Sequence, residues 1–383
     1  MPTQPDSDID RAMMAIALRM AERGLGTTAP NPSVGAVIFD EATGELIARG
    51  WTQPGGRPHA ETEAIARAGE RARGKTIYVT LEPCSHYGRT PPCAEAIIAA
   101  GLKRVVCAIL DPDPRVSGRG VRMLREAGLE VTRGVLATEA NRVTRGHIQR
   151  VTERRPWVQL KMALAADGGY AHGTGTAPVW VTGPQARAHG HLLRARADAI
   201  LVGSGTVRDD DPELTCRLPG LAARSPVRVL LTGHELPSLT AKLVRSAGQV
   251  AGKVPVWVFV SPDAGARQCA ALERAGCRVF HVATVGGRPW LPAVCEALVA
   301  EGITRLLVEG GPTMWQAFSA SGFADEIVCY RGGGAGSAGS AAGPEIFART
   351  ALGILRPGAR DRGYEFCETR HLGADSVHVF RRK

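Results

Sequence analysis

Apolar residues in the first 150 positions form short runs that alternate between helical and extended periodicity. They recur at helical spacing over 8–23, where Gly24 and Gly26 favour an end to the helix. Apolar, β-branched runs predict strands at 34–39, 46–51, 76–81, 104–110 and 129–132. Further helices are expected to begin near positions 59 and 91 and to cover 116–127. The pattern therefore predicts an α/β layer over 1–150.

A polar connector rich in arginine and glutamate follows at about 134–156. Beyond it, apolar strand-like runs at 157–164, 199–203, 227–231, 254–260, 278–282 and 305–308 alternate with helical stretches. Strands that alternate with helices predict a mainly parallel sheet covered on both faces. We place the domain boundary near Val151, which gives domains at 1–150 and 151–383.

Composition is compatible with this division into two soluble domains. The chain has 383 residues, of which 44% are hydrophobic and 22% charged. It has no uninterrupted apolar stretch of about 18 residues, and its first ten residues lack the basic and apolar regions of a secretory signal. We therefore expect a cytoplasmic protein without a membrane partner.

Charge and cysteine content narrow the function classes further. The formal net charge of +10 comes chiefly from dispersed arginines, without a basic run interleaved with aromatic residues. This pattern favours small anionic molecules over nucleic acid as partners, and part of the excess is explained equally well by a solvated surface. The nine cysteines are scattered and odd in number, which does not indicate a disulfide framework.

The chemistry-bearing residues of the first half are His59, Glu61, Cys84 and Cys93. A catalytic zinc usually takes three protein ligands and leaves its fourth position to water, whose pKa falls from about 15.7 to roughly 7. His59, Cys84 and Cys93 supply that ligand count. Glu61 fits best as the general acid/base that takes a proton from the water and delivers it to a leaving amine.

Simpler interpretations of the same residues remain open. A lone His-x-Glu occurs by chance, and the two cysteines are also compatible with buried packing residues. A structural zinc site would normally need a fourth Cys or His ligand, and the nearby candidate is His86. The combination of all four residues nevertheless favours catalytic zinc.

The motif resembles that of the zinc-dependent cytidine deaminase superfamily, in which His-x-Glu is followed by Pro-Cys-x-x-Cys. Here eight residues, rather than two, separate Cys84 from Cys93. The longer motif at 83–93 and the Pro-Asn-Pro-Ser-Val-Gly-Ala-Val motif at 30–37 resemble those of the bifunctional deaminase/reductase of riboflavin biosynthesis. The resemblance implies a cytidine-deaminase-like α/β/α domain and Zn²⁺. It also favours Asn31 as a residue that binds the pyrimidine edge, although an Asn-Pro turn explains Asn31 equally well from the sequence alone.

Two glycine-rich turns in the second half follow expected strands, at 203–206 and 310–313. Free backbone N–H groups at such a turn can bind a pyrophosphate, but from the sequence alone a glycine turn after a strand is more often an ordinary tight turn. Neither turn has the Gly-x-Gly-x-x-Gly pattern, which disfavours a Rossmann domain.

The second half resembles the reductase domain of the same riboflavin enzyme, which is dihydrofolate-reductase-like and uses NADPH. Matching motifs extend from Gln159 to Thr313. Together with the motifs of the first half, they make the resemblance cover nearly the whole chain. Carried over position by position, it implies that the cofactor contacts Ala163, Trp180, Thr206, Asp210, Gly311, Pro312, Thr313, Met314, Trp315, Gln316 and Ala317. It implies that the substrate contacts Arg194, Leu214, Arg217 and Glu309.

Physical chemistry supports part of this assignment. Arg194, Arg217 and Lys161 offer cations that could clamp a ribose 5-phosphate through charge-assisted contacts. Surface solvation would explain the arginines equally well, and a cap of the following turn is the simpler alternative for Glu309. Asp210 lies in a run of three aspartates, a pattern typical of a solvated loop, so its cofactor role is only what the resemblance implies.

Two departures from the family pattern concern the reductase half. One extra residue lies near 174–180, where Ala177 or Pro178 replaces a substrate-contacting serine, and 332–343 is a Gly/Ala/Ser segment. The resemblance implies an enzyme that deaminates a diaminopyrimidine ribose phosphate with zinc and then reduces its ribose with NADPH. Its expected partners are this small-molecule substrate and further copies of the chain in a homo-oligomer. Other open hypotheses are a tRNA-editing type of deaminase, a deaminase with a lapsed reductase half, and a zinc-stabilised binding module.

Overall fold

The computed structural model describes residues 7–88, 90–114, 116–166, 169, 180–248, 254–333 and 363–383. The chain forms two compact units, the first of Met1–Pro156 with Gly302–Thr304 and the second of Trp157–Glu301 with Arg305–Lys383. The change of unit follows Pro156, whereas Val151, near which we expected the boundary, lies inside helix α5 (Ala137–Thr152). Among the described residues, no helix has the length and apolar character needed to cross a membrane.

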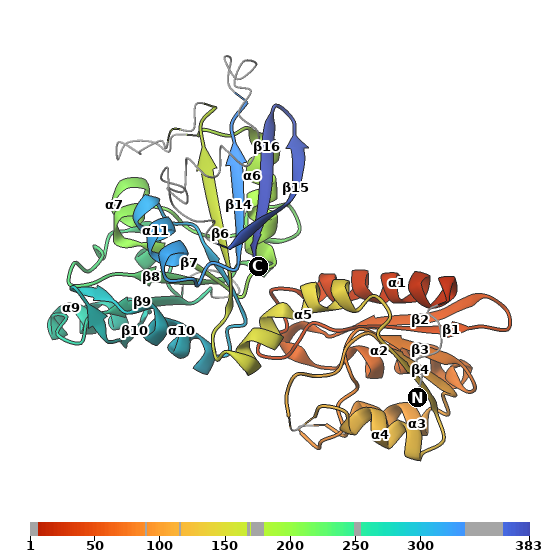
Figure 1. Ribbon diagram of the computed structural model, residues 1–383. Helices are drawn as coiled ribbons and strands as arrows, with labels where there is room; N and C mark the ends of the chain where they lie inside the picture. Colours follow the sequence, from red (N-terminus) through yellow and green to blue (C-terminus); the bar gives the residue numbers. More distant parts are fainter. Residues whose placement is uncertain are drawn as a thin grey trace. The chain divides into compact units, whose positions relative to one another are not determined.

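The first unit is built on a five-stranded sheet with the order β2-β1-β3-β4-β5 (Figure 1). The β1–β2 and β1–β3 pairs are antiparallel, and the β3–β4 and β4–β5 pairs are parallel. The strands are β1 (Gly35–Asp40), β2 (Glu45–Trp51), β3 (Thr76–Val79), β4 (Arg104–Cys107) and β5 (Glu130–Arg133). The helices are α1 (Asp8–Gly24), α2 (Ala60–Ala68), α3 (Cys93–Ala99), α4 (Arg119–Glu126) and α5.

Helices cover both faces of this sheet, which gives three layers. On one face, Met14 and Ala17 of α1 and Ala140 of α5 pack against Val37 and Tyr78. On the other face, α2, α3 and α4 bury apolar side chains against β1, β3 and β4, including Ala64, Ile97, Leu124, Ile38, Ile77 and Val105. Because successive strand residues point to opposite faces, the continuous apolar runs of β1 and β3 fill both cores. The α/β/α arrangement expected from the resemblance is therefore the one observed.

The second unit contains a nine-stranded sheet with the order β10-β9-β8-β7-β13-β6-β14-β16-β15. Its strands are β6 (Trp157–Leu164), β7 (Ala199–Gly203), β8 (Val227–Leu231), β9 (Val256–Val260), β10 (Arg278–His281), β13 (Arg305–Val308), β14 (Glu326–Arg331), β15 (Tyr364–Leu372) and β16 (Asp375–Arg382). A small separate hairpin pairs β11 (Thr284–Val285) with β12 (Arg288–Pro289). The helices are α6 (Pro184–Ala195), α7 (Ser204–Asp210), α8 (Lys242–Arg245), α9 (Ala266–Arg274), α10 (Leu291–Ala300) and α11 (Pro312–Ala320).

Parallel pairing joins β10 through β14 in this sheet, as the alternation of strands and helices predicts. The last two strands differ, because β16 pairs antiparallel with both β14 and β15. All side chains of β15 are exposed or half-buried, so its apolar pattern is too weak for the sequence to indicate a strand. The segments 174–179 and 334–343, which carry most of the two departures noted above, lie outside the described residues.

Candidate active sites

The first site lies at the carboxyl ends of β3 and β4, where their following loops meet the start of α2 and α3. His59 is the N-cap residue of α2, and Cys93 is the first residue of α3. Cys84 lies in the loop after β3 and accepts a hydrogen bond from the Cys93 backbone N–H at 3.2 Å. A helix N-terminus therefore stabilises negative charge on the Cys84 sulfur.

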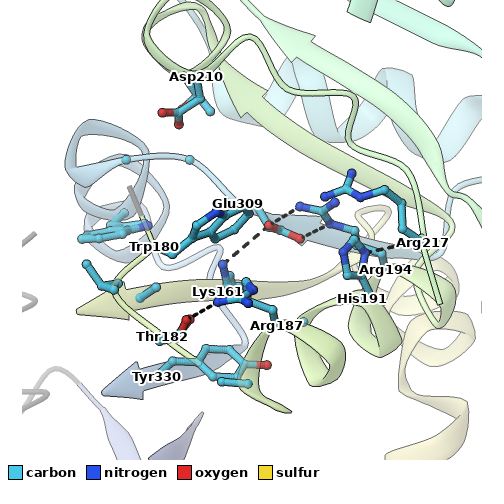
Figure 2. A pocket seen from close by; sticks show the side chains of 18 residues that line it. Lys161, Trp180, Thr182, Arg187, His191, Arg194, Asp210, Arg217, Glu309 and Tyr330 are labelled. Atoms are coloured by element: carbon cyan, nitrogen blue, oxygen red, sulfur yellow. Dashed lines mark hydrogen bonds and ion pairs between the residues drawn. The ribbon is translucent and has the colours of Figure 1, made fainter. Parts of the chain in front are cut away.

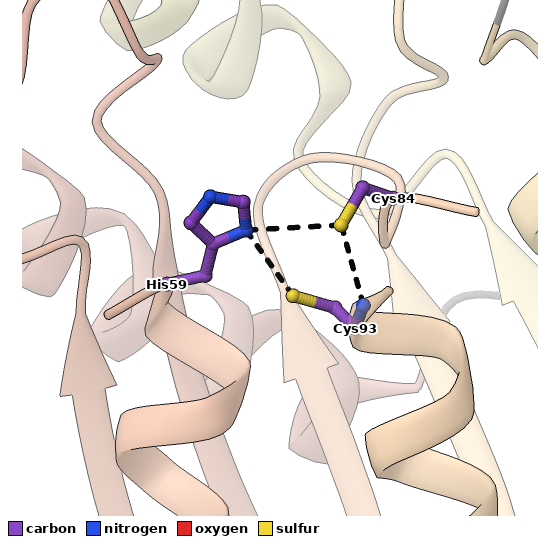
Figure 3. A group of neighbouring side chains, drawn as sticks. All are labelled: His59, Cys84 and Cys93. Atoms are coloured by element: carbon purple, nitrogen blue, oxygen red, sulfur yellow. Dashed lines mark hydrogen bonds between the residues drawn. The ribbon is translucent and has the colours of Figure 1, made fainter. Parts of the chain in front are cut away.

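The three predicted metal ligands lie together (Figure 3). His59 Nδ1 is 3.2 Å from Cys93 Sγ and 3.7 Å from Cys84 Sγ. Tetrahedral zinc with Zn–N of about 2.05 Å and Zn–S of about 2.3 Å would place nitrogen and sulfur roughly 3.6 Å apart. The observed distances bracket that value, so the donor set fits zinc through Nδ1 of His59. Among the described residues, His86 is not part of this ligand group, although it lines the same pocket.

The protonation states of the sulfurs also suit a cation. The hydrogen bond with the Cys93 thiol lowers the pKa of Cys84 to about 4, while the same bond and burial raise the pKa of Cys93. The side chains alone therefore hold one thiolate and one thiol. A divalent cation bound between them would favour the thiolate form of both.

Glu61 lies in the first turn of α2, two residues after His59, and is 3% exposed. Burial raises the pKa of Glu61 to about 7, an effect that the charge of His59 partly offsets. A carboxyl group that titrates near neutral pH can both accept and donate a proton during a reaction. Its position beside the ligands fits the general acid/base role that we predict from the sequence.

A pocket of about 210 Å³ opens beside these residues, and Asn31, His59, Glu61 and Cys84 line it. The Asn31 side chain donates a 2.8 Å hydrogen bond to the carbonyl oxygen of Gly56. Gly56 has a φ of +84°, and a Cβ there would lie 2.5 Å from the Asn31 amide nitrogen. This glycine therefore allows the amide to be fixed at the pocket wall, where its carbonyl oxygen remains available to a ligand.

Glu82 is a positioning residue that we did not predict from the sequence. It is 4% exposed and accepts hydrogen bonds from the backbone N–H groups of Asp111, Gly118 and Val121, at 3.2, 2.9 and 3.1 Å. These bonds tie the loop that carries Cys84 to the loop after β4 and to the first turn of α4. In the sequence, the one local indication of this role is the Leu-Glu-Pro-Cys motif, in which a carboxylate lies between a strand and a candidate metal ligand.

The second site is a cavity of about 190 Å³ where β6, β7 and β13 end (Figure 2). Ten of the predicted residues line it: Lys161, Ala163, Trp180, Arg194, Thr206, Asp210, Arg217, Glu309, Gly311 and Trp315. The predicted positions that do not line it are Leu214, Pro312, Thr313, Met314, Gln316 and Ala317. Leu214 is 2% exposed and packs in the apolar core of this unit.

Both glycine turns stand where a strand changes into a helix. Gly203 is the N-cap residue of α7 after β7, and Gly311 is the N-cap residue of α11 after β13. β7 and β13 are parallel neighbours in the sheet, so the two turns are brought to the same sheet edge. This is the edge at which parallel α/β sheets commonly bind phosphorylated ligands.

Glu309 is the electrostatic centre of the second cavity. Arg194 donates from Nε to Glu309 Oε1 at 2.8 Å and from Nη2 to Oε2 at 2.9 Å, while Lys161 Nζ lies 3.7 Å from Oε2. Burial alone would raise the pKa of Glu309, but the charges of Arg194 and Lys161 lower it to about 2. Glu309 is therefore a buried carboxylate rather than a simple turn cap.

This pairing changes the expected role of Arg194. Its fork is occupied by Glu309, and its Nη1 donates to the Thr215 carbonyl oxygen at 3.0 Å. Arg217 also lines the cavity but is 46% exposed and lies 3.8 Å from Glu213, so its guanidinium is more accessible to a phosphate. We conclude that Arg217 is the better candidate of the two for the phosphate contact.

His191, Arg187 and Tyr330 also line the cavity, and we did not predict them from the sequence. Burial, with the charges of Arg194 and Arg217, lowers the pKa of His191 to about 4, so this ring is neutral at pH 7. Its Nδ1 accepts the Arg217 backbone N–H at 3.3 Å, which leaves the proton on Nε2. Arg187 lies 5.0 Å from the Trp180 ring centroid and donates to the Thr182 carbonyl oxygen at 2.6 Å.

Comparison with known proteins shows relatives along nearly the whole chain. The chain is 36% identical to the riboflavin biosynthesis protein RibD of Escherichia coli (strain K12), over 96% of this chain and 97% of that protein. It belongs to the RibD family. The RibD C-terminal domain model matches residues 156–335, and the cytidine and deoxycytidylate deaminase zinc-binding region model matches residues 7–109.

Solved RibD structures agree with this membership. Acinetobacter baumannii RibD, form 1, has a TM-score of 0.81 at 33% identity and covers 98% of this chain and 99% of its own. The diaminohydroxyphosphoribosylaminopyrimidine deaminase/5-amino-6-(5-phosphoribosylamino)uracil reductase from Thermotoga maritima has a TM-score of 0.79 at 32% identity, with the same coverage. RibD membership confirms the two fold classes and the zinc and NADPH dependence expected from the resemblance.

Proposed function

We propose that this chain catalyses two successive steps of riboflavin biosynthesis, as RibD proteins do. The first is hydrolytic deamination of 2,5-diamino-6-(5-phosphoribosylamino)pyrimidin-4-one, and the second is NADPH-dependent reduction of the ribosyl group to ribityl. The observation that carries the proposal is the His59, Cys84 and Cys93 cluster with buried Glu61 beside it, in a chain whose relatives match both halves.

In the first pocket, zinc when bound would supply a water molecule with a pKa lowered to roughly 7. His59, Cys84 and Cys93 would hold the metal and leave its fourth position open. Glu61 would accept the proton of the attacking water and deliver it to the exocyclic amine, which leaves as ammonia. Asn31 would bind the pyrimidine edge through its carbonyl oxygen.

In the second cavity, NADPH when bound would supply the hydride. Ala163, Trp180, Thr206, Asp210 and the 311–317 segment are the proposed cofactor contacts, and the N-termini of α7 and α11 suit its pyrophosphate. Arg217 would bind the substrate phosphate. Glu309 would fix Lys161 and Arg194 at the reacting sugar, and Leu214 would support the substrate from the core side.

Further parts of the proposal concern the surroundings of the enzyme. We place the deaminase in the first compact unit and the reductase in the second, in a cytoplasmic homo-oligomer that binds neither nucleic acid nor membranes. Size measurement by light scattering and fractionation of cells that produce the full chain would check the assembly and the location.

The decisive experiment follows ammonia release and NADPH oxidation with the diaminopyrimidine substrate. Glu61→Gln should lower ammonia release by at least about 10²-fold, because general acid/base transfer is lost, while zinc stays near one equivalent. Glu63→Gln is the matched control, since Glu63 lies on the same helix but pairs with Arg67 at the surface. Retained deamination by Glu61→Gln would remove Glu61 from the mechanism. Ammonia release without NADPH oxidation would leave a deaminase with an inactive reductase half.

A further inference from the structure

The deaminase pocket extends beyond the residues that can hold zinc and the pyrimidine. Its other wall is formed by Asp111, in the loop after β4, and by His147, Arg150 and Val151 of α5. Positions 147, 150 and 151 lie on one face of a helix because they are three and four residues apart. β4 is the parallel neighbour of β3, so the Asp111 loop and the Cys84 loop leave the same sheet edge.

Two polar atoms on this wall have no hydrogen-bond partner in the described part of the chain. His147 Nε2 lies 3.2 Å from Asp111 Oδ1, but His147 Nδ1 is buried and has no hydrogen-bond partner among the described residues. Arg150 Nε is likewise buried without an acceptor in the described part of the chain. Buried polar groups in native proteins are nearly always satisfied, so two such atoms in one pocket indicate that a ligand or water completes them.

Arg150 also lacks a carboxylate partner within the described residues. Its Nη1 donates only a long hydrogen bond, 3.4 Å, to the Pro30 carbonyl oxygen at the pocket wall. Among the described residues, most donors of this guanidinium are therefore available to an anion. Arg57, another cation of the pocket, is instead bound through Nη1 to the Thr90 hydroxyl.

We infer that Arg150 and His147 form the subsite that binds the ribose 5-phosphate of the deaminase substrate. Arg150 binds the phosphate through its guanidinium, because a charged fork is the strongest available partner for phosphate oxygens. His147 donates from Nε2 to Asp111 and accepts a ribose hydroxyl at Nδ1. This inference rests on the proposed function, since it assigns the sugar and phosphate end of the substrate of that same site.

The test compares deamination of the phosphorylated substrate with deamination of its dephosphorylated riboside. Arg150→Ala should lower kcat/KM for the phosphorylated substrate by about tenfold or more and leave that for the riboside unchanged, because only the phosphate contact is lost. The matched control is Arg142→Ala, which removes the same charge from an exposed position of α5 and should change neither value.

His147→Phe keeps an aromatic ring but removes both nitrogens. It should lower kcat/KM for both substrates by a similar factor, because both carry the ribose, and so leave the preference for phosphate intact. Bound zinc, near one equivalent, shows that each variant retains the metal site. If Arg150→Ala loses zinc, the phosphorylated substrate and the riboside are compared with Arg150→Lys and Arg150→Gln instead.

Several results would overturn the inference. One is an equal effect of Arg150→Ala on the two substrates, and another is unchanged kinetics for His147→Phe, which would mean that water alone completes these atoms. A loss of phosphate preference in Arg57→Ala but not in Arg150→Ala would assign the phosphate to Arg57. Wild-type protein that deaminates neither substrate would instead contradict the proposed function itself.

Discussion

Replacing Glu309 by Gln should destabilise the second unit strongly, because it leaves the buried Arg194 without its counter-charge. The two hydrogen bonds of this pair are 2.8 and 2.9 Å long, and the side chains are only 14% and 8% exposed. The fall in the pKa of Glu309 from 4.5 to about 2 corresponds to about 3 kcal/mol in favour of the charged form. Breaking one partner of a buried ion pair costs a similar amount, about 3–5 kcal/mol.

A loss of about 3 kcal/mol should lower the melting temperature of this unit by roughly 6–12 °C. Tryptophan fluorescence can follow the unit selectively in a Trp51→Phe background, because the other five tryptophans all lie within 157–315. Deamination by the first unit should persist, which would show that the damage is local.

The matched control is Glu301→Gln in the same unit. Glu301 accepts two hydrogen bonds from Arg278, at 2.7 and 2.9 Å, but these side chains are 32% and 54% exposed. Water screens this pair, so its loss should cost no more than about 1 kcal/mol. Equal shifts in melting temperature for Glu309→Gln and Glu301→Gln would refute the reasoning, because geometry rather than burial would then set the cost.

Three further predictions address the sites directly. Cys84→Ser should lose bound zinc and ammonia release while NADPH-dependent reduction of the deaminated substrate continues, whereas Cys367→Ser should keep the metal; elemental analysis decides between them. Arg217→Ala should raise the reductase KM for the phosphorylated substrate by about tenfold, unlike Arg245→Ala on the surface, and an unchanged KM would count against the phosphate contact. The pKa of His191 is lowered from 6.5 to about 4, so the folded state disfavours its proton and the second unit should lose stability as the pH falls from about 6.5 towards 4. His191→Gln should flatten that dependence in urea unfolding, and an identical slope would contradict it.

The sequence by itself indicated the three candidate metal ligands, which the fold brings together, and most of the strands. His59 and Cys93 lie at the starts of two helices that the local sequence pattern predicts. Because only eight residues separate Cys84 from Cys93, the two sulfur atoms cannot lie far apart. Apolar runs such as 157–164 and 199–203 favour buried strands, and the predicted boundaries of these two strands agree with those of β6 and β7. These features depend on neighbours in the chain, which a sequence shows directly.

Only the tertiary structure decided which distant groups meet. Arg194 binds Glu309, 115 positions away, and this contact occupies two of its guanidinium donors, which residue type alone did not indicate. His147 becomes a candidate site residue only because the fold brings α5 beside the loop after β4, where His147 contacts Asp111. The strands β14 and β16 likewise pair antiparallel across a long stretch of chain. The type of a residue sets which interactions its side chain can make. Its burial and the partner buried beside it decide which of those interactions and which charge state it has in the folded protein.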